Sequence, residues 1–584
     1  MKVLVTGGTG VIGEGAIPAL LKAGHEVRLL TRGAEKDAAE WPEGVEPFAA
    51  DVSRKRSLRG AADGCDAVVH ITGIVNESPP KVTFESINVE GTQNILAEAR
   101  RAGAGRFIFV SSLGADRGRS AYHQSKLKAE EHVKEFTGDW LILRPGGVYG
   151  PGDEVITTLL KLIRVLPVMP VVDGGEQRFQ PLWFEDMGAA VAACVESELS
   201  REILELAGRE VITVNDLIEK LSDITGRTPT RLPVPSFIAT LGARLFDGNS
   251  LADGLKKLTG LDVPVDEAKL TMLLEENFIK EPARNALTET LGIEPLPLQK
   301  GLKALADLLP EQSVEEGVGS LERKRFHADI VGSRFDAEGL LEEFRARCVE
   351  VMPLEFVAEP GAASTVEMGA TLTASIPMRG NIQVRVEEVT PKRLTFVTLE
   401  GHPLAGIVQF KTSALRSNSV RFMIEIHTRD ASFFDKLTLT LGGSMMQNMN
   451  WQQVVERVVE LSGGTAPRGV QSESDTLDEE ETASAVRMIQ TIMKRYKRVM
   501  NAARAEGIEK PPSPRAASKL KTRRTTSRRK SSQKQSAAKD ARASVGDAVG
   551  KMTEAASSLL QTVSSAASQL TQASKKGRAK KAGR

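Results

Sequence analysis

The stretch that decides the fold is Met1–Gly13, which reads MKVLVTGGTGVIG. The apolar run at residues 2–5 is too short for a helix and predicts a buried parallel strand. A glycine-rich turn follows directly, and Glu14–Ala23 then has apolar positions on one helical face. Strand, glycine turn and helix in this order are typical of a dinucleotide site, where the diphosphate lies at the positive end of the helix.

The glycines of this turn have separate predicted roles. Gly7 and Gly8 allow the tight turn, and Gly10 lacks a Cβ, so backbone N–H groups can approach a pyrophosphate. Gly13 lets the helix lie close to the strand. The residues expected to contact the dinucleotide here are Gly7, Thr9, Gly10, Val11, Ile12 and Gly13.

Strand and helix patterns alternate from the first residue to about residue 196. Because alternating patterns of this kind build parallel sheets, we predict an α/β fold with a doubly wound Rossmann sheet. The expected strands are Val3–Thr6, Glu26–Thr31, Val45–Ala49, Ala67–Ile71, Arg106–Ser111 and Trp140–Arg144.

Residues after the second and third strands bear on the choice of cofactor. NAD sites often carry an acidic residue at the end of the second strand, but this chain has Thr31-Arg32 there. A guanidinium suits a 2′-phosphate, so Arg32 predicts NADP, with NAD and a merely solvated arginine as alternatives. Asp51 and Val52 could hold the adenine edge, although an ordinary helix N-cap would also explain Asp51.

Chemistry-bearing side chains follow the fifth expected strand. Ser111 and Ser112 lie at its carboxyl end, where open α/β sheets bind ligands. Tyr122 and Lys126 follow and, four residues apart on a helix, share one face. An ammonium beside a phenol stabilises the phenolate and lowers the phenol's pKa, which predicts an acid/base group usable near neutral pH.

Several motifs occur together in a recognisable order. They are TGGTGVIG, Asp51-Val52, Asn88–Thr92, the Ser-Ser strand end, Tyr122-x-x-x-Lys126 and Arg144–Gly150. This set resembles the extended or atypical short-chain dehydrogenase/reductases, the NAD-dependent epimerase/dehydratase superfamily. The resemblance implies that Ser112, Tyr122 and Lys126 are catalytic. It also implies cofactor contacts from Thr72, Gly73, Asn88, Tyr122, Lys126, Pro145 and Val148.

The segments Arg178–Met187 and Ile212–Leu217 indicate which branch of this family the chain resembles most. Over about residues 1–305 the chain looks most like the NAD(P)H-binding accessory subunit of respiratory complex I and its bacterial relatives. The resemblance to that branch implies a protein with a structural role, in which the catalytic residues are often lost. This chain, however, keeps Ser112, Tyr122 and Lys126. We therefore predict an NADP(H)-dependent oxidoreductase acting on a carbonyl or alcohol. The alternatives are a non-catalytic NAD(P)H-binding scaffold or sensor, and a sugar-nucleotide-type epimerase or dehydratase.

A small substrate lobe is expected from residues 151–174 and 211–308, completing a first domain over residues 1–310. The aliphatic run Leu159–Met169 suggests an apolar substrate such as a lipid or quinone-like molecule. A plain helix-helix core and a membrane-facing surface are the alternatives.

A second domain is expected after a linker at residues 311–321. Residues 322–464 resemble the α+β helix-grip, or START/polyketide-cyclase-like, superfamily, which implies an apolar ligand between sheet and long helix. Its chemistry-capable side chains are His402, Glu425 and His427. The expected elements are helices at Phe335–Val351 and Phe433–Leu461 and strands at Thr365–Ile376, Gln383–Val389, Leu394–Leu399, Ile407–Ser413 and Val420–His427.

The carboxyl-terminal part differs in composition. Ser472–Glu481 is expected to be an acidic loop and Thr482–Ala505 a helix that packs on a domain. Residues 506–584 form a basic low-complexity tail, in which residues 510–584 hold 19 lysines and arginines against 3 acidic residues. Such a tail is attracted non-specifically to nucleic acid or anionic membrane. An apolar heptad seam over 545–570 predicts self-association or a partner helix.

Composition limits the remaining possibilities. The chain has 584 residues and a formal net charge of +1. Cys65, Cys194 and Cys348 are scattered without metal-ligand spacing, so we expect no metal site and a reducing compartment. Without a signal peptide or an uncharged apolar stretch of membrane length, a cytoplasmic location is expected, with peripheral membrane contact left open.

Overall fold

The computed structural model describes residues 1–505, except 39–40, 166–167, 235–274, 316, 353–358, 361–362, 377–379, 417–418 and 432–443. Nearly all described residues belong to one compact unit, residues 1–375 and 381–518. The predicted basic tail, its heptad seam and part of the substrate lobe therefore lie outside the described residues. Among the helices that are described, none has the length and apolar character needed to cross a bilayer.

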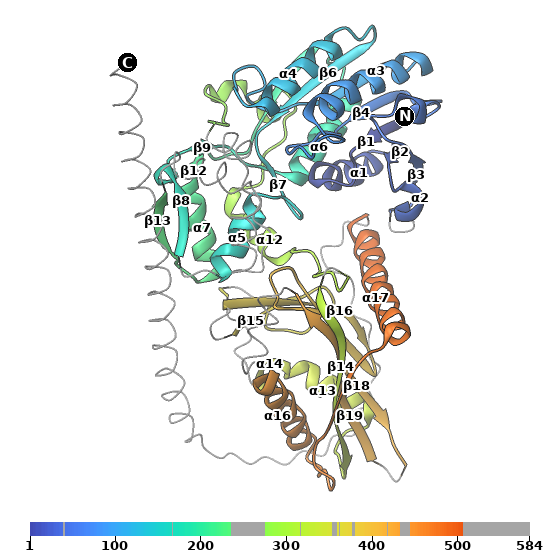
Figure 1. The fold of residues 1–584 in the computed structure, drawn as a ribbon, viewed down its shortest axis with the longest axis vertical. Helices are drawn as coiled ribbons and strands as arrows, with labels where there is room; N and C mark the ends of the chain where they lie inside the picture. The colour runs from blue at the N-terminus through green and yellow to red at the C-terminus, as the bar shows by residue number, and fades with distance from the viewer. Residues whose placement is uncertain are drawn as a thin grey trace, which may run out of the picture. The chain divides into compact units, whose positions relative to one another are not determined.

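The amino-terminal domain is built on a seven-stranded parallel sheet of order β11-β6-β5-β4-β1-β2-β3 (Figure 1). This confirms the predicted Rossmann fold. Its strands are β1 Lys2–Thr6, β2 Glu26–Thr31, β3 Val45–Ala49, β4 Ala67–His70, β5 Arg106–Val110, β6 Asp139–Pro145 and β11 Glu202–Leu206. The six predicted strands are all present, but β11 was missed because it is an edge strand with charged and exposed positions.

Helices cover both faces of this sheet (Figure 1). They are α1 Val11–Lys22, α2 Ala34–Asp37, α3 Glu90–Ala102, α4 Ala121–Lys134 and α6 Phe184–Glu196, with short turns η2 Lys55–Leu58 and η3 Glu85–Val89. Helices α1 and α6 contact through small residues. A Cβ on Gly15 would lie 2.1 Å from the carbonyl oxygen of Phe184, and one on Gly188 would lie 2.3 Å from the backbone of Gly15. These glycines therefore permit the close approach of α6, which anchors one layer of the domain.

A small lobe follows, with its own apolar core. Its elements are β7 Val148–Tyr149, α5 Ile156–Val165, β8 Val168–Val172, η4 Asp173–Gly175, β9 Arg178–Phe179, β10 Leu182–Trp183, β12 Ile212–Thr213, α7 Val214–Thr225, β13 Thr230–Val234, η5 Pro282–Arg284 and α12 Leu298–Asp307. Helix α11, Ala286–Glu289, packs instead in the core of the parallel sheet. Leu160, Ile163 and Met169 are buried in the core of the small lobe against α7 and α12. The aliphatic run therefore forms a helix-helix core, and its character is no evidence for an apolar substrate.

The second domain contains a seven-stranded sheet of order β15-β16-β17-β18-β19-β14-β20 (Figure 1). Its strands are β14 Val318–Val331, β15 Thr371–Ile376, β16 Gly380–Thr390, β17 Arg393–Thr398, β18 Leu404–Ala414, β19 Ser419–Asp430 and β20 Gln471–Thr476. Pairing is antiparallel from β16 through to β20. Helices α13 Ala337–Ala346, α14 Cys348–Val351 and α16 Ser444–Ser462 contribute to a core on one face.

Two boundaries of this domain were predicted wrongly. Strand β14 begins at Val318, inside the expected linker, and Ser472–Glu481 is not a loop but contains β20 and the start of α17. The domain therefore extends beyond residue 464. The sequence did not indicate strand β14 because its charged side chains form ion pairs across the sheet, Arg325 with Glu425 and Arg323 with Asp475. Without knowledge of these partners, such a strand reads as a polar linker.

Helix α17, Glu479–Ala505, covers the other face of the second sheet. Ile489 and Ile492 pack with Val397 of β17 and Ile407 of β18. The expectation that this helix packs on a domain is confirmed. The helix-grip family resemblance stays a prediction, as does its apolar ligand, because residues 432–443, immediately before α16, lie outside the described residues.

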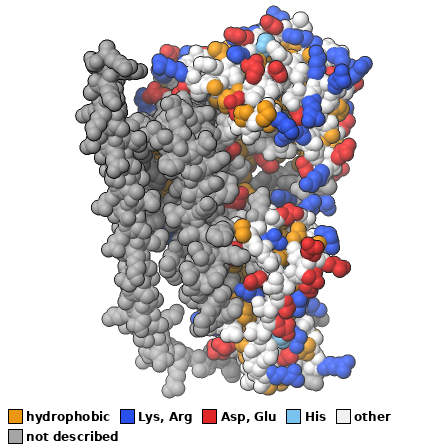
Figure 2. All heavy atoms as spheres, in the orientation of Figure 1, with side chains coloured by type: hydrophobic (Ala, Val, Ile, Leu, Met, Phe, Trp, Pro, Cys, Tyr) orange, Lys and Arg blue, Asp and Glu red, His pale blue; other side chains and the backbone are white. Residues whose placement is uncertain are grey.

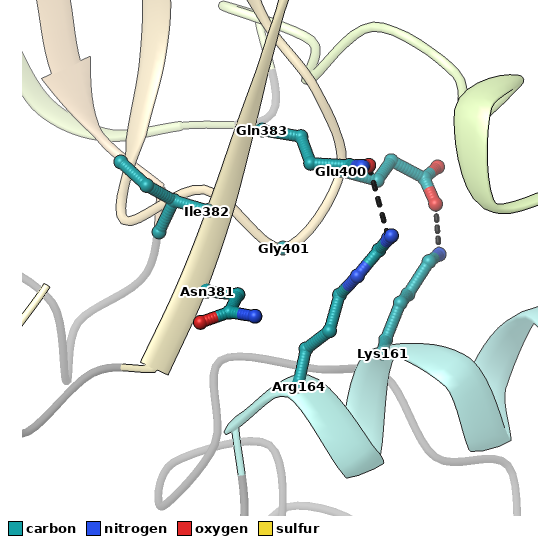
Figure 3. A pocket seen from close by; sticks show the side chains of 7 residues that line it. All are labelled: Lys161, Arg164, Asn381, Ile382, Gln383, Glu400 and Gly401. Atoms are coloured by element: carbon teal, nitrogen blue, oxygen red, sulfur yellow. Dashed lines mark hydrogen bonds and ion pairs between the residues drawn. The ribbon is translucent and has the colours of Figure 1, made fainter. Parts of the chain in front are cut away.

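Charges of both signs are interspersed over the described part of the surface in Figure 2. A small pocket between α5 and the second sheet shows the same balance (Figure 3). Arg164 donates to the side-chain oxygen of Gln383 at 2.9 Å and forms a buried ion pair with Glu359, and Lys161 pairs with Glu400. Both basic side chains are thus neutralised. The lining residues are Lys161, Arg164, Asn381, Ile382, Gln383, Glu400 and Gly401.

Candidate functional site

The glycine turn after β1 is shaped by close internal contacts, with one exception. Gly7 has φ +75°, and a Cβ there would lie 2.6 Å from the amide nitrogen of Thr72. A Cβ on Gly13 would lie 2.3 Å from the backbone of Gly8. At Gly10 the nearest atom would be the carbonyl oxygen of Gly7, 3.8 Å away. The fold therefore does not need a glycine at position 10, whereas a ligand approaching the turn closely would.

Gly10 is also the N-cap of α1, with extended backbone at φ −98° and ψ 176°. No side chain of the described residues caps this helix end. The first-turn N–H groups, at Val11, Ile12 and Gly13, therefore have no side-chain acceptor there, and the helix dipole adds positive potential. An open cradle at an uncapped helix start fits a diphosphate, as predicted for this turn with Thr9.

The loops after β2 and β3 carry the residues expected near the adenosine. Arg32 is exposed beyond the end of β2. Asp51 Oδ1 accepts hydrogen bonds from the amide and the hydroxyl of Ser53, at 3.0 and 2.7 Å. The side chain of Asp51 thus stabilises its own turn, as in the capping alternative, while Val52 is buried beside it.

Asn88 ties the loop after β4 to the helix that carries the candidate acid/base residues. Its Oδ1 accepts from the amide of Ile74 at 2.8 Å, and its Nδ2 donates to the hydroxyl of Ser125 at 2.9 Å. In the same loop, the amide of Thr72 donates to Thr6 Oγ1, and a Cβ on Gly73 would lie 3.1 Å from Lys126 Nζ. Asn88 therefore positions the loop of Thr72 and Gly73 beside Lys126.

Ser112 and Tyr122 meet at the carboxyl end of β5. The Ser112 hydroxyl acts to lower the pKa of the Tyr122 phenol. Burial acts more strongly in the opposite direction, so the pKa of Tyr122 stands above its ordinary value. The ring of Tyr122 is half-buried and packs edge-on against Phe84, with ring centres 6.1 Å apart. The catalytic roles that the family resemblance implies for Ser112 and Tyr122 stay a prediction.

Lys126 occupies the next turn of α4. Its Nζ donates to the carbonyl oxygen of Val110 at 2.8 Å and lies 4.8 Å from the ring centre of Phe109. Burial lowers the pKa of Lys126 to about 8, and the Glu130 carboxylate opposes that shift. The predicted lowering of the Tyr122 pKa by Lys126 is not found, since burial dominates that phenol and Ser112 supplies the opposing effect.

Pro145 and Val148 border the same edge of the sheet. Pro145 is buried at the end of β6, and its carbonyl oxygen accepts from the amide of Leu113 at 2.8 Å. Val148 is half-buried in β7. The carboxyl ends of β1, β4, β5 and β6 lie at one edge of the sheet, as expected for an open α/β sheet. The glycine cradle, Gly73 and Ser112 follow these strands, and Lys126 of α4 reaches the end of β5.

Comparison with known proteins supports this geometry. The sequence profile described as "NAD dependent epimerase/dehydratase family" matches residues 3–207. The ceramide reductase of Caulobacter vibrioides is 32% identical over 258 residues, which cover 43% of this chain and 79% of that protein. The chain belongs to the NAD-dependent epimerase/dehydratase family. This membership supports binding of a nicotinamide cofactor, and the open turn at Gly10 fits the diphosphate of such a group.

Other relatives of this epimerase/dehydratase chain are more distant. Sterol demethylase protein B of Methylococcus capsulatus is 28% identical over 40% of this chain and 78% of its own length. The mitochondrial NADH dehydrogenase [ubiquinone] 1 alpha subcomplex subunit 9 of Arabidopsis thaliana is 27% identical over 42% of this chain and 64% of its own. A Thermus thermophilus UDP-glucose 4-epimerase structure with NAD is 22% identical, covers 53% of this chain and 98% of that one, and has a TM-score of 0.40.

A buried ion pair behind helix α4 of this family member was not predicted. Arg144 donates to both carboxylate oxygens of Glu130, at 2.9 and 2.7 Å, and Ser111 donates to Glu130 at 2.6 Å. Glu130 is fully buried and Asp116 also binds Arg144, at 2.7 Å. No short-range pattern indicates this pair, because Arg144 and Glu130 lie 14 residues apart, on β6 and α4. Ser111 is thus a structural group, whereas Ser112 lies in the site.

Two of the three chemistry-capable residues of the second domain, His402 and Glu425, are held by partners within that domain. His402 Nδ1 lies 3.0 Å from the amide nitrogen of Leu404 in its own turn. Glu425 forms ion pairs with Arg325 and Lys411. These ion pairs and hydrogen bonds bring the pKa of Glu425 down to about 2 against the effect of burial. His402 and Glu425 therefore have structural partners in this domain.

Proposed function

We propose that this chain is an NADP(H)-dependent oxidoreductase that interconverts a carbonyl and an alcohol on an apolar, lipid-like small molecule. The observation that carries the proposal is that Ser112, Tyr122 and Lys126 come together at the end of β5, at the same sheet edge as the open cradle at Gly10. A proton donor and a hydroxyl anchor thus share the place where a family cofactor would present its nicotinamide.

The bound cofactor would supply hydride to the substrate carbon or accept it. In the reducing direction, Tyr122 Oη gives its proton to the carbonyl oxygen as the alcohol forms, and it takes the proton back in the reverse direction. Ser112 Oγ donates a hydrogen bond to the same oxygen and so orients the carbonyl. A phenol with a raised pKa is protonated at neutral pH, which suits the role of acid in reduction.

The substrate class is inferred from the names of relatives. A ceramide reductase, a sterol demethylase protein and a 3 beta-hydroxysteroid dehydrogenase/Delta 5→4-isomerase of Mycobacterium tuberculosis are among them. Each name concerns a lipid, and none concerns a nucleotide sugar. A lipid carbonyl is therefore a better first probe than a sugar nucleotide.

The test is NADPH oxidation by the full chain with long-chain 3-keto-sphingoid, keto-ceramide and 3-ketosteroid probes. We expect turnover with at least one, and we expect Tyr122→Phe to abolish it while NADPH binding stays intact. Tyr149→Phe is the matched control, because the buried Tyr149 hydroxyl has no hydrogen-bond partner among the described residues. Absence of turnover on the whole panel, or full activity in Tyr122→Phe, would contradict the proposal.

The preference for NADP rests on Arg32 alone. Arg32→Ala is expected to weaken NADPH binding at least tenfold and to leave NADH binding nearly unchanged, because only NADPH carries the 2′-phosphate. Lys22→Ala, an exposed cation at the far end of α1, is the control. Equal loss for both nucleotides would assign Arg32 a different role.

A second candidate is a nucleotide-binding protein without turnover, as the complex I subunit among the relatives suggests. The specific observation in its favour is that Lys126 does not make the Tyr122 phenol more acidic. In that case NADPH would raise the melting temperature. Tyr122→Phe would then change neither that stabilisation nor any rate.

A further inference from the structure

The segment Glu275–Ile279 lies across the loop that joins β5 to α4. Asn277 Nδ2 donates to the carbonyl oxygen of Leu113 at 3.1 Å, and Arg117 donates to the carbonyl oxygen of Phe278 at 3.0 Å. Asn277 also pairs through its backbone with both neighbours of Phe179 in β9. A distant part of the chain thus holds the loop that begins at Ser112 and ends just before Tyr122.

Glu275 makes several of these contacts close together, at the first turn of α4. Its carboxylate accepts from the amides of Arg119 and Ser120, at 2.6 and 2.9 Å, and from the Ser120 hydroxyl at 3.0 Å. His123 Nδ1 lies 2.5 Å from Glu275 Oε2. Burial raises the pKa of Glu275, but these hydrogen bonds outweigh it and hold that pKa below its ordinary value. The group is therefore a carboxylate at neutral pH.

The imidazole of His123 has little freedom to move away from this carboxylate. It is 2% exposed, and a Cβ on Gly118 would lie 2.3 Å from its Nδ1. On the other side, a Cβ on Gly114 would lie 3.5 Å from its Nε2. The ring is thus enclosed by the β5–α4 loop and fixed by Glu275. His123 directly follows Tyr122, so fixing His123 also fixes the turn that presents the phenol.

We propose that Glu275 is a positioning residue for Tyr122, acting through Ser120 and His123 to hold the phenol against Ser112. The inference rests on the proposed role of Tyr122 and adds to it a residue more than 150 positions away in the chain. Helix α4 has its own side-chain cap in Ser120, so the Glu275 carboxylate is not needed merely to start the helix. The negative charge of Glu275 instead stabilises the turn that contains Tyr122.

The test compares Glu275→Gln with Glu276→Gln in the full chain. Glu276 is the adjacent residue and makes an exposed ion pair with Arg178, so it controls for loss of one negative charge nearby. Where a substrate is in hand, we expect Glu275→Gln to lower kcat about 10- to 100-fold while the Kd for NADPH stays within twofold, because misplacing a catalytic group by about 1 Å has an effect of that size. Glu276→Gln should match wild type.

A second readout needs no substrate. The chain has only 3 tyrosines, so the phenolate absorbance of Tyr122 can be isolated as the difference between each protein and its Tyr122→Phe counterpart. We expect Glu275→Gln to shift this titration, since the contact between Tyr122 and Ser112 changes, and Glu276→Gln to leave it unchanged. An unshifted titration in folded Glu275→Gln would overturn the inference. Absence of turnover in every variant, with the shift present, would instead count against the proposed function alone.

Discussion

Lys126 Nζ donates a 2.8 Å hydrogen bond to the carbonyl oxygen of Val110, which ties the helix of the candidate acid to the strand of the candidate anchor. The contact costs the lysine its hydration, and burial lowers its pKa to about 8. The ammonium therefore predominates below pH 8 and is lost above it.

The affinity for NADPH should depend on whether Lys126 is protonated. If the ammonium form holds the cofactor ribose, the affinity for NADPH should fall about tenfold between pH 7 and pH 9, following the protonated fraction. Lys126→Arg keeps its charge over this range and should bind with little pH dependence. Fluorescence titration of NADPH measures both. Lys128→Arg, an exposed neighbour on α4, is the control, and a flat profile in wild type would remove Lys126 from the nucleotide site.

Two glycines of one turn should respond differently to the same substitution. Gly13→Ala places a Cβ 2.3 Å from the Gly8 backbone, so we expect a large loss of stability in urea unfolding. Gly10→Ala meets nothing closer than 3.8 Å and has a backbone that alanine adopts, so its stability should change by less than about 1 kcal/mol.

Gly10→Ala should nevertheless weaken NADPH binding at least tenfold, because the new methyl group occupies the space above the first-turn amides of α1. Calorimetry of the folded variant measures this directly. A Gly10→Ala protein that binds NADPH as wild type does would show that the diphosphate lies elsewhere.

Glu387 in β16 should make stability fall as the pH rises. Burial and the neighbouring Glu311 carboxylate raise its pKa from 4.5 to about 9, with Arg385 and Lys497 opposing them. Between these values the folded chain keeps a proton that the unfolded chain releases, so Glu387 costs more stability at each higher pH. The slope reaches at most about 1.4 kcal/mol per pH unit.

Replacing Glu387 by Gln removes this cost without changing the shape of the side chain. The variant should equal wild type near pH 4.5 and become progressively more stable than it up to pH 8, as measured by urea unfolding. The exposed Glu367→Gln is the control and should show no such divergence. A constant difference at all pH values would mean that Glu387 is already ionised in the folded chain.

Several features were predictable because their signals are local. A buried strand is a short apolar run, a glycine turn is visible in the letters, and residues four apart share a helix face. The strands β1 to β6 followed from such patterns. Strands β14, β20 and β11 did not, because their charged residues look like loop residues until partners such as Glu425 and Arg325 are known.

In the candidate site, too, some features could be predicted from local patterns and others could not. The aliphatic helix α5 could equally have lined a ligand or filled a core, and only the packing of Leu160 and Ile163 against other helices decided it. The spacing of Tyr122 and Lys126 likewise predicted that the pKa of the phenol is lowered. Burial instead holds that pKa above its ordinary value.

By itself, the sequence determined that a glycine-rich turn joins the first strand to a helix and that a hydroxyl, a phenol and an ammonium follow on neighbouring elements, since short-range periodicity encodes strands, turns and helix faces. Only the tertiary structure decided that Glu275 reaches His123, that Glu130 neutralises Arg144, and that Gly10 alone among these turn glycines faces open space. Such contacts depend on how distant segments return to one another, and the free energy of each depends on burial, which no local pattern specifies.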